Sequence, residues 1–417
     1  MISKYKSKSE FTRNVLTLVT GTTLAQAIPF ALSPILTRIY TPEDYGVFAL
    51  FVSLTSIISV FSSGRYELAI MLPKKDYDAI HLIALTWIIT VIISFITLLI
   101  VFVFNTEISN LLGNSEISNW LYFVPISIFI TGMFKGINYW FNRKKQYKNL
   151  AINRIIQSGS NSSLNVGFGV GGLGAGGLVF SSIMGQILSA LYLLNIMRVK
   201  FKIRPDLISR IKILALARKY KKFPQYDIMA TFANVSSHQI TNVLFNTLLS
   251  STVAGYYYFT QRIMGIPISF LSAAVSDVFR EQASRDYQKY GNAKVIYLST
   301  FKKLFFLSLI PSVLIYFFAV DVFTFVFGEN WRISGVYAQI LVPMFFLRFI
   351  SSPLTFMLYI GEKQNLNLIV NLLFLSLTIL SFYVSNSPLQ TVKLLSLSGV
   401  IVYFIYLFLS AKIAKVF

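Results

Sequence analysis

The chain has 417 residues, of which 55% are hydrophobic and only 13% are charged, and its mean hydropathy is +0.65. The charged share is about half of the roughly 25% found in soluble domains, and a soluble fold of this length could not keep so much apolar surface out of water. There is no cysteine and there are only two histidines. Disulfides, thiolate nucleophiles and zinc–thiolate sites are therefore excluded, and a multi-histidine metal site is not expected.

Apolar stretches of about 20 residues, the length of helix that crosses a bilayer, recur along the whole chain. The basic N-terminal segment runs into the first stretch without a small-residue cleavage site, so we expect a retained span and not a removed signal peptide. We predict twelve transmembrane helices. They lie near residues 14–38, 46–63, 79–104, 119–141, 152–170, 175–197, 224–247, 253–277, 298–320, 336–358, 366–385 and 390–411. The seventh is unusually polar, and the glycine-rich segment 167–177 predicts a tight external turn between the fifth and sixth.

Lysine and arginine are concentrated in every second loop. These basic positions are Lys4, Lys6, Lys8, Arg13, Arg65, Lys74, Lys75, Arg143, Lys144, Lys145, Lys148, several between Arg198 and Lys222, Arg280, Arg285, Lys289, Lys294, Lys363, Lys412 and Lys415. The other loops carry almost none, apart from Arg38, Arg332 and Lys393. Because short basic loops stay in the cytoplasm, we expect a multi-pass protein of the bacterial inner membrane with both termini cytoplasmic. The same pattern accounts for the net charge of +21, so we expect no nucleic-acid partner.

The two halves of the sequence resemble each other. KKQYKNLAIN at 144–153 matches EKQNLNLIVN at 362–371, and extending this alignment places Pro125 on Pro343. Nearer the start of each half, RIYTPEDYGVFAL resembles LLSSTVAGYYYFT, which pairs Gly46 with Gly255. The alternative is chance similarity between apolar segments, but the matches include Gln, Asn and Pro.

The matched segments follow the third and the ninth span, so they share one topology, as parallel repeats do. We therefore predict an all-α membrane protein with an N-terminal six-helix lobe at 1–197, a basic cytoplasmic linker at 198–222 and a C-terminal six-helix lobe at 223–417. The lobes would surround a central cavity, as in many transporters.

Five cations lie within or at the ends of the predicted spans. Charges inside a membrane are costly, so they are candidates for a functional site. Arg262 and Arg348 lie deep in spans eight and ten, whereas Lys135 lies nearer a cytoplasmic end, where snorkelling is an equal alternative. Arg38 and Arg65 end the first two spans and could instead be interfacial anchors.

Neighbouring carboxylates offer other roles for two of these cations. Arg65 has Glu67 close by, which permits a local ion pair, and Arg262 could pair with Asp277 or bond carbonyls freed near Pro267. No acidic residue lies deep enough to neutralise Arg262 or Arg348 in an obvious way. We therefore expect an anionic substrate to neutralise these two arginines.

The polar seventh span gives a second candidate surface. Asp227, Thr231, Asn234, His238 and Asn242 recur at helical spacing and form one stripe, which should face a wet cavity or, alternatively, pack polar groups between helices. The first span adds Gln26, followed by two prolines, and is expected to line the same cavity. No catalytic set, cofactor site or phosphate-binding loop is recognisable, because segment 167–177 lacks the GK[ST] ending.

The segment LTRIYTPEDYGVFALFVSLTSIISVFSSGRYELAIMLPKKD at 36–76 resembles the N-terminal signature of Wzx-type O-antigen flippases. These belong to the multidrug/oligosaccharidyl-lipid/polysaccharide (MOP) superfamily. The resemblance is most specific in TRIYTPEDYG and GRYELAIMLPKK and extends over the rest of the chain only in span number and layout. It implies a MATE-like fold, alternating access and a cationic lumen that moves undecaprenyl-diphosphate-linked oligosaccharides to the periplasmic leaflet.

The expected partners are thus the lipid-linked oligosaccharide, membrane lipid and other proteins of polysaccharide assembly. One alternative is a multidrug exporter of the same superfamily, although cationic drugs would favour acidic residues in the cavity. The other is an integral-membrane ligase or polymerase, which usually has a large periplasmic loop or an acidic catalytic cluster. The sequence favours a transporter and not an enzyme.

Overall fold

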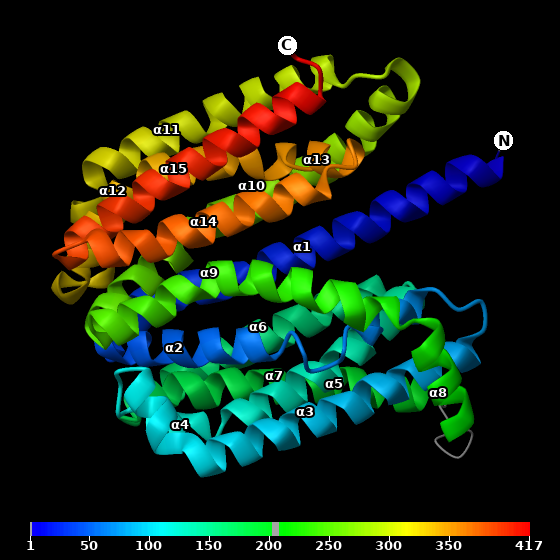
Figure 1. The fold of residues 1–417 in the computed structure, drawn as a ribbon, viewed down its shortest axis with the longest axis horizontal. Helices are drawn as coiled ribbons and strands as arrows, with labels where there is room; N and C mark the ends of the chain where they lie inside the picture. The colour runs from blue at the N-terminus through cyan, green and yellow to red at the C-terminus, as the bar shows by residue number, and fades with distance from the viewer. Residues whose placement is uncertain (1, 202–207) are drawn as a thin grey trace. The chain divides into compact units, whose positions relative to one another are not determined.

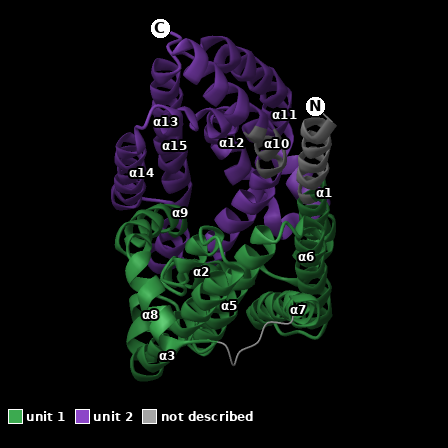
Figure 2. Ribbon diagram, turned by 90° about the vertical axis from the view of Figure 1, so that its right-hand side faces the viewer, with its two compact units in different colours: residues 1–239 green, residues 240–417 purple. Residues whose placement is uncertain are grey.

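The computed structural model describes residues 2–201 and 208–417, without the side chains of 2–16, 18, 19, 267, 269–274 and 277. Throughout the described residues the chain is helical and forms no strand, as predicted. It divides into two compact units, residues 1–239 and 240–417 (Figure 2). The division falls inside a helix of the seventh predicted span, and the predicted lobe boundaries at 197 and 223 stay predictions.

Unit 1 contains six long helices and part of a seventh (Figure 1). Its elements are α1 (Ile2–Ile39), α2 (Pro42–Ile58), the 3-10 helix η1 (Tyr66–Met71), α3 (Asp76–Leu111), α4 (Ile117–Leu121), α5 (Val124–Arg143), α6 (Tyr147–Val170), α7 (Ala175–Phe201), α8 (Arg210–Lys219), the π-helical turn η3 (Phe223–Asp227) and the first half of α9 (Ile228–Leu248). Unit 2 begins within α9. It continues through α10 (Ser251–Tyr290), α11 (Lys294–Phe327), the 3-10 helix η4 (Glu329–Trp331), α12 (Arg332–Leu354), α13 (Met357–Ile360), α14 (Gln364–Val384) and α15 (Pro388–Ile413).

Each of the twelve predicted spans coincides with one long helix, and the glycine-rich segment forms the turn between α6 and α7. Among the described residues, seven helical segments are long and apolar enough to cross a membrane. They comprise α3, α4–α5, α7, α11, η4–α13, α14 and α15. Of the other long helices, α1 and α10 contain residues whose side chains the structure does not describe, α2 is slightly short with 17 residues, and α6 and α9 are more polar.

At two predicted spans the end of the helix differs from the expected end of the span for identifiable reasons. The second span was expected to reach residue 63, but α2 ends at Ile58, because the chain turns through Gly64 and Arg65, both with positive φ, into η1. The eighth was expected to end at 277, but α10 continues to Tyr290, where Gly291 at φ 67° caps it in the left-handed conformation.

The second helix of each predicted half starts with the same kind of cap. Thr41 Oγ1 accepts a hydrogen bond from the backbone N–H of Asp44, whose carboxylate accepts the N–H of Thr41, a full capping box. Ser250 Oγ accepts the N–H of Val253 at the start of α10. The alignment that pairs Gly46 with Gly255 also pairs Thr41 with Ser250.

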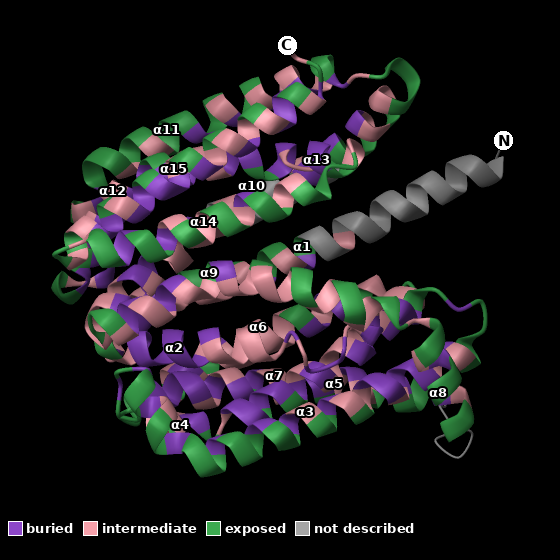
Figure 3. Cartoon of the chain, viewed as in Figure 1, coloured by how far each residue is buried: buried purple, intermediate pink, exposed green. Residues whose placement is uncertain are grey.

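Many large apolar side chains of α3 and α11 are exposed. Figure 3 shows the exposed stretches of both helices in green. Phe102 is 73% exposed and Phe325 is 85% exposed, and many large apolar neighbours along the same helices are also exposed. A soluble monomer rarely exposes a contiguous apolar surface of this extent. These faces are suited to lipid.

Small residues bring α5 close to α3. A Cβ at Gly132 would clash with Thr90, and one at Gly136 would lie 2.9 Å from Thr86 Oγ1. This is the small-xxx-small arrangement that lets membrane helices approach closely. Lys135 lies between these glycines in sequence.

Candidate functional site

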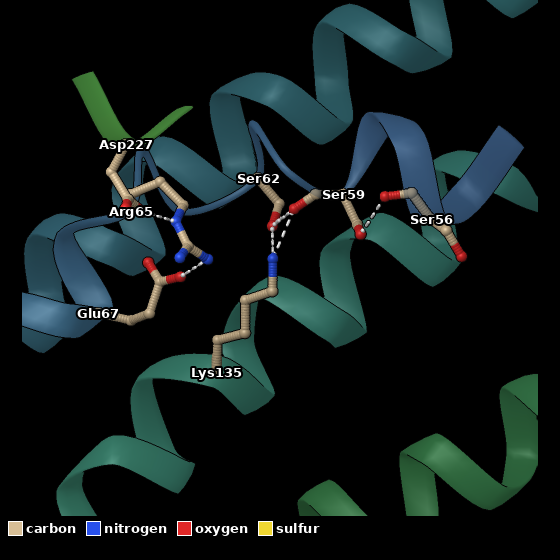
Figure 4. A network of polar contacts seen from close by, with 7 residues as sticks. All are labelled: Ser56, Ser59, Ser62, Arg65, Glu67, Lys135 and Asp227. Carbon is tan, nitrogen blue, oxygen red and sulfur yellow. Dashed lines mark hydrogen bonds and ion pairs between the residues drawn. The ribbon is translucent and has the colours of Figure 1, made fainter. Parts of the chain in front are cut away.

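Charged and hydroxyl side chains of unit 1 meet where α5 contacts the C-terminal end of α2 (Figure 4). We call this set the Lys135 network. It consists of Ser56, Ser59, Ser62, Arg65, Glu67, Lys135 and Asp227. Its members come from α2 and the following turn, η1, α5 and η3. The network joins two cations predicted to be functional, Lys135 and Arg65, with two carboxylates.

Lys135 projects from α5 onto the C-terminal end of α2 (Figure 4). Its Nζ donates to the carbonyl oxygen of Ser59, at 2.6 Å, and to Ser62 Oγ, at 3.3 Å. A cation is favourable there because the last carbonyls of a helix carry partial negative charge. In the described part of the chain no carboxylate forms an ion pair with Lys135, although Glu67 is near enough to interact electrostatically.

Arg65 forms ion pairs with two carboxylates. Its Nε donates to Asp227 Oδ2 at 2.5 Å, and its Nη1 lies 3.3 Å from Glu67 Oε1. Glu67 is only 1% exposed, and a buried carboxylate is costly unless it is paired. The predicted local pair with Glu67 is therefore present, and the pair with Asp227 adds a contact across 162 residues of sequence.

A hydroxyl-lined pocket of about 160 Å³ adjoins the network and shares Ser59 and Ser56 with it. Its walls come from α2, α5 and α7. The lining residues are Phe51, Val52, Thr55, Ser56, Ser59, Ser127, Thr131, Ser182 and Gln186. Thr131 Oγ1 donates to Gln186 Oε1 at 3.1 Å. Ser127 is fully buried, and its Oγ has no hydrogen-bond partner among the described residues.

The sequence missed the serines of this site, although their spacing was visible. Ser53, Ser56, Ser59 and Ser62 recur every third residue along α2 and its C-terminal turn. Ser53 Oγ donates to Gln239 Oε1 at 3.0 Å, and the Phe61 ring lies 5.4 Å from that of Phe232. Together with the Arg65–Asp227 pair, these contacts fix the first half of α9 and η3 to α2 within unit 1.

The two deep arginines belong to unit 2. The guanidinium of Arg348 lies 5.8 Å from the ring centroid of Phe345 and within electrostatic range of the Tyr257 hydroxyl, which accepts a hydrogen bond from Gln261. Arg262 is half-buried near Tyr258. Neither arginine is ion-paired with a carboxylate whose side chain the structure describes.

The remaining predicted site residues lie in varied surroundings. Arg38 is exposed in the last turn of α1. On α9, Thr231 is half-buried, Asn234 and His238 are exposed, and Asn242 is buried, while Gln26 on α1 is half-buried. The roles proposed for them in a cavity stay predictions.

The family model described as "Polysaccharide biosynthesis protein" matches residues 35–335. The chain belongs to this polysaccharide biosynthesis family. The match includes the segment 36–76 on which the resemblance to polysaccharide flippases was recognised, and it confirms that resemblance. No curated protein matches the chain.

Solved structures show the fold of this family member. An inward-facing multidrug-resistance MATE transporter of the MOP superfamily matches with a TM-score of 0.72, at 14% identity over 95% of each chain. A MOP-superfamily transporter from Pyrococcus furiosus, described as having a binding pocket of reverse polarity, matches with a TM-score of 0.61, at 14% identity over 97% of this chain and 96% of that one. A MATE protein in a bent conformation also gives 0.61, at 13% identity. The predicted MATE-like, all-α membrane fold is confirmed.

Proposed function

We propose that this protein is a flippase for lipid-linked oligosaccharides. It moves undecaprenyl-diphosphate-linked repeat units of O-antigen or a related polysaccharide from the cytoplasmic to the periplasmic leaflet of the bacterial inner membrane, by alternating access. The observation that carries the proposal is a set of three cations on the predicted spans, Lys135, Arg262 and Arg348. None of the three forms an ion pair with a carboxylate among the described side chains. The polysaccharide biosynthesis family and the transporter fold support it.

The substrate explains why such cations are retained. Its acyl tail can remain in lipid, whereas its diphosphate and sugars cannot cross hydrocarbon without replacing their water. Arginine supplies a planar pair of donors to phosphate oxygens, and lysine supplies a point charge. We assign the diphosphate to Arg262, Arg348 and Lys135, with Arg65 and Arg38 as further contacts. Thr231, Asn234, His238, Asn242 and Gln26 would bond sugar hydroxyls.

An exporter of cationic drugs is the alternative from the same superfamily, and the fold alone is equally consistent with it. The positive charge of Lys135, Arg262 and Arg348 on the predicted spans favours an anionic substrate. The two carboxylates of the Lys135 network, Glu67 and Asp227, are both ion-paired with Arg65, which leaves neither of them available to a cationic drug.

A ligase or polymerase is disfavoured by the lengths of the connections. The predicted periplasmic connections are all short within the described chain, and the longest of them, between α3 and α4, covers only residues 112–116. A catalytic domain does not fit in such loops. No group of three or more potential metal ligands occurs among the described residues either.

The test is reconstitution into proteoliposomes with a lipid-linked oligosaccharide in both leaflets. A membrane-impermeant glycosidase or lectin reports the fraction accessible from outside. A flippase raises this fraction above that reached in empty liposomes, without changing the oligosaccharide's mass. The proposal would be overturned if the accessible fraction of the oligosaccharide did not rise. It would also be overturned if the same proteoliposomes transported a cationic drug equally well.

A further inference from the structure

The short helix α8 lies against the end of unit 1 that carries the first turns of α3 (Figure 1). Its sequence, RIKILALARK, buries Ile213 and Leu216 in the apolar core formed by α3, α5 and η1. These two residues are three apart and share one face of the helix. That face is fully used by packing within unit 1.

Polar contacts fix α8 in this orientation. Tyr66 donates its hydroxyl to the carbonyl of Ala217 at 3.1 Å, and burial raises the pKa of this phenol, so that it remains a donor. The N–H of Ser209 donates to Nε2 of His81, whose Nδ1 bonds the carbonyl of Tyr77. His81 must therefore carry its proton on Nδ1.

The opposite face of α8 has an apolar centre. Ile211 is 82% exposed and Leu214 is 61% exposed. Helical spacing places both on the same face as Arg218, with Arg210 at its edge. A helix that faces water on this side would bear polar residues at 211 and 214, whereas one that lies in a membrane surface has this combination of leucine, isoleucine and basic residues.

Basic residues outnumber acidic residues around α8. Segment 210–222 contains six basic residues and no acidic residue. Of the basic residues in α8, Lys212 is paired, at 3.1 Å from Asp78. At the same end of unit 1, Arg143 and Lys144 contact Asp76 at the start of α3. This surface is therefore complementary to anionic headgroups, which attract basic segments next to a membrane.

We propose that α8 is an interfacial helix that binds the anionic phospholipids of the bilayer. Ile211 and Leu214 insert below the headgroups, and Arg210 and Arg218 contact lipid phosphates. The other face of the helix, docked through Ile213 and Leu216, thereby ties unit 1 to the membrane surface. The proposal is independent of what the protein transports.

The absence of cysteine from the chain allows a site-specific test. Ile211→Cys and, as a water-exposed control in the loop before α4, Ser115→Cys are each labelled with bimane in the full-length protein. The labelled proteins are placed in nanodiscs of phosphatidylcholine with or without phosphatidylglycerol. Quenching by nitroxide-labelled lipid and by aqueous iodide is measured at both sites.

The proposal expects lipid quenching at position 211 that increases with phosphatidylglycerol, and iodide quenching at 115. Adding Arg210→Gln and Arg218→Gln should abolish the increase, whereas Arg332→Gln with Lys393→Gln, which also removes two charges, should leave it unchanged. If iodide quenches both sites equally, α8 lies in water and the proposal fails. If lipid quenching at 211 does not depend on phosphatidylglycerol, the recognition of anionic lipid is wrong.

Discussion

Asn153 and Ser189 exchange two hydrogen bonds between α6 and α7, with Asn153 Nδ2 2.9 Å from Ser189 Oγ and the hydroxyl donating back to Oδ1 at 3.1 Å. In the second half, the Tyr406 hydroxyl of α15 lies within reach of two amide oxygens of α14, Asn371 Oδ1 at 3.1 Å and Asn367 Oδ1 at 2.8 Å, and can donate to either of them. Asn153 and Asn371 are the residues that the sequence repeat aligns. The same asparagine therefore joins the fifth and sixth helices of each predicted half.

We predict that Asn153→Leu and Asn371→Leu each destabilise the protein. Hydrogen bonds between membrane helices contribute about 0.6 kcal/mol each on average. In Asn153→Leu the unpaired Ser189 hydroxyl adds to the loss, whereas in Asn371→Leu the Tyr406 hydroxyl keeps Asn367 as an acceptor. The measurement is the temperature at which half of the detergent-solubilised protein is no longer monodisperse. Asn386→Leu, in the exposed turn before α15, is the control and should change little. Equal midpoints for all three variants would contradict the structural role of this pair.

Topology is predicted from the basic loops alone. Reporter fusions after Gly113, Gly172 and Ser251 should report the periplasm, and fusions after Lys148, Lys212 and Lys289 the cytoplasm, because the positive-inside rule fixes short loops. One clear inversion among the six would refute the twelve-span arrangement with both termini inside.

The internal repeat makes a separate prediction. In an experimental structure, the first six spans should superpose on the last six by rotation about the membrane normal.

The sequence predicts the helices well because each leaves a local signal: about twenty apolar residues, a glycine turn, or a hydroxyl cap such as Thr41. It predicts the site less well because the deciding contacts are not local. The Arg65–Glu67 pair was foreseen from two neighbouring residues, but the Arg65–Asp227 pair joins positions 162 residues apart. Lys135 bonds a main-chain carbonyl, and any residue type at position 59 would supply one.

Arg65 is predicted to stabilise unit 1 through Glu67. Arg65→Ala should reduce the yield of folded protein, because removal of one partner from a buried ion pair typically costs roughly 3 kcal/mol or more. Asp227→Asn should cost less than about 1 kcal/mol, since Asp227 is 38% exposed. Adding Glu67→Gln to Arg65→Ala should recover much of the loss by removing the unpaired charge. If Glu67→Gln gives no recovery, burial of Glu67 is not the reason for the defect.

Substitutions of Lys135 can show whether its function depends on the positive charge or only on the hydrogen bond to Ser59. Lys135→Gln keeps a donor for the Ser59 carbonyl but removes the cation. If the residue only caps α2, this variant should retain function. We expect instead that it loses most surface polysaccharide per unit of membrane-inserted protein, while Lys135→Arg retains part. Lys302→Gln, an exposed lysine of α11, should behave as wild type. Full export by a normally abundant Lys135→Gln variant would exclude the substrate-binding role.

Arg262 gives the most direct test of the proposed function. It lies in α10, eleven residues after the helix begins at Ser251 and far from its end at Tyr290. An arginine at the centre of a membrane helix costs about 2.5–3.5 kcal/mol on insertion scales, and a lipid-facing position offers nothing to offset that cost. We therefore expect the side chain to meet the substrate diphosphate in the predicted cavity.

Arg262→Ala should leave insertion and protein level near normal but abolish surface polysaccharide. Arg262→Lys should retain partial function, because the point charge remains while the paired donors are lost. Arg332→Ala, which removes an exposed arginine 3.7 Å from Glu329, should have no effect. If Arg262 instead serves only to bond carbonyls near Pro267 or to pair with Asp277, the alanine variant should lose stability first, and export should follow the amount of folded protein. The deciding quantity is surface polysaccharide per unit of inserted protein: wild-type export by an abundant Arg262→Ala protein would remove this residue from the phosphate site.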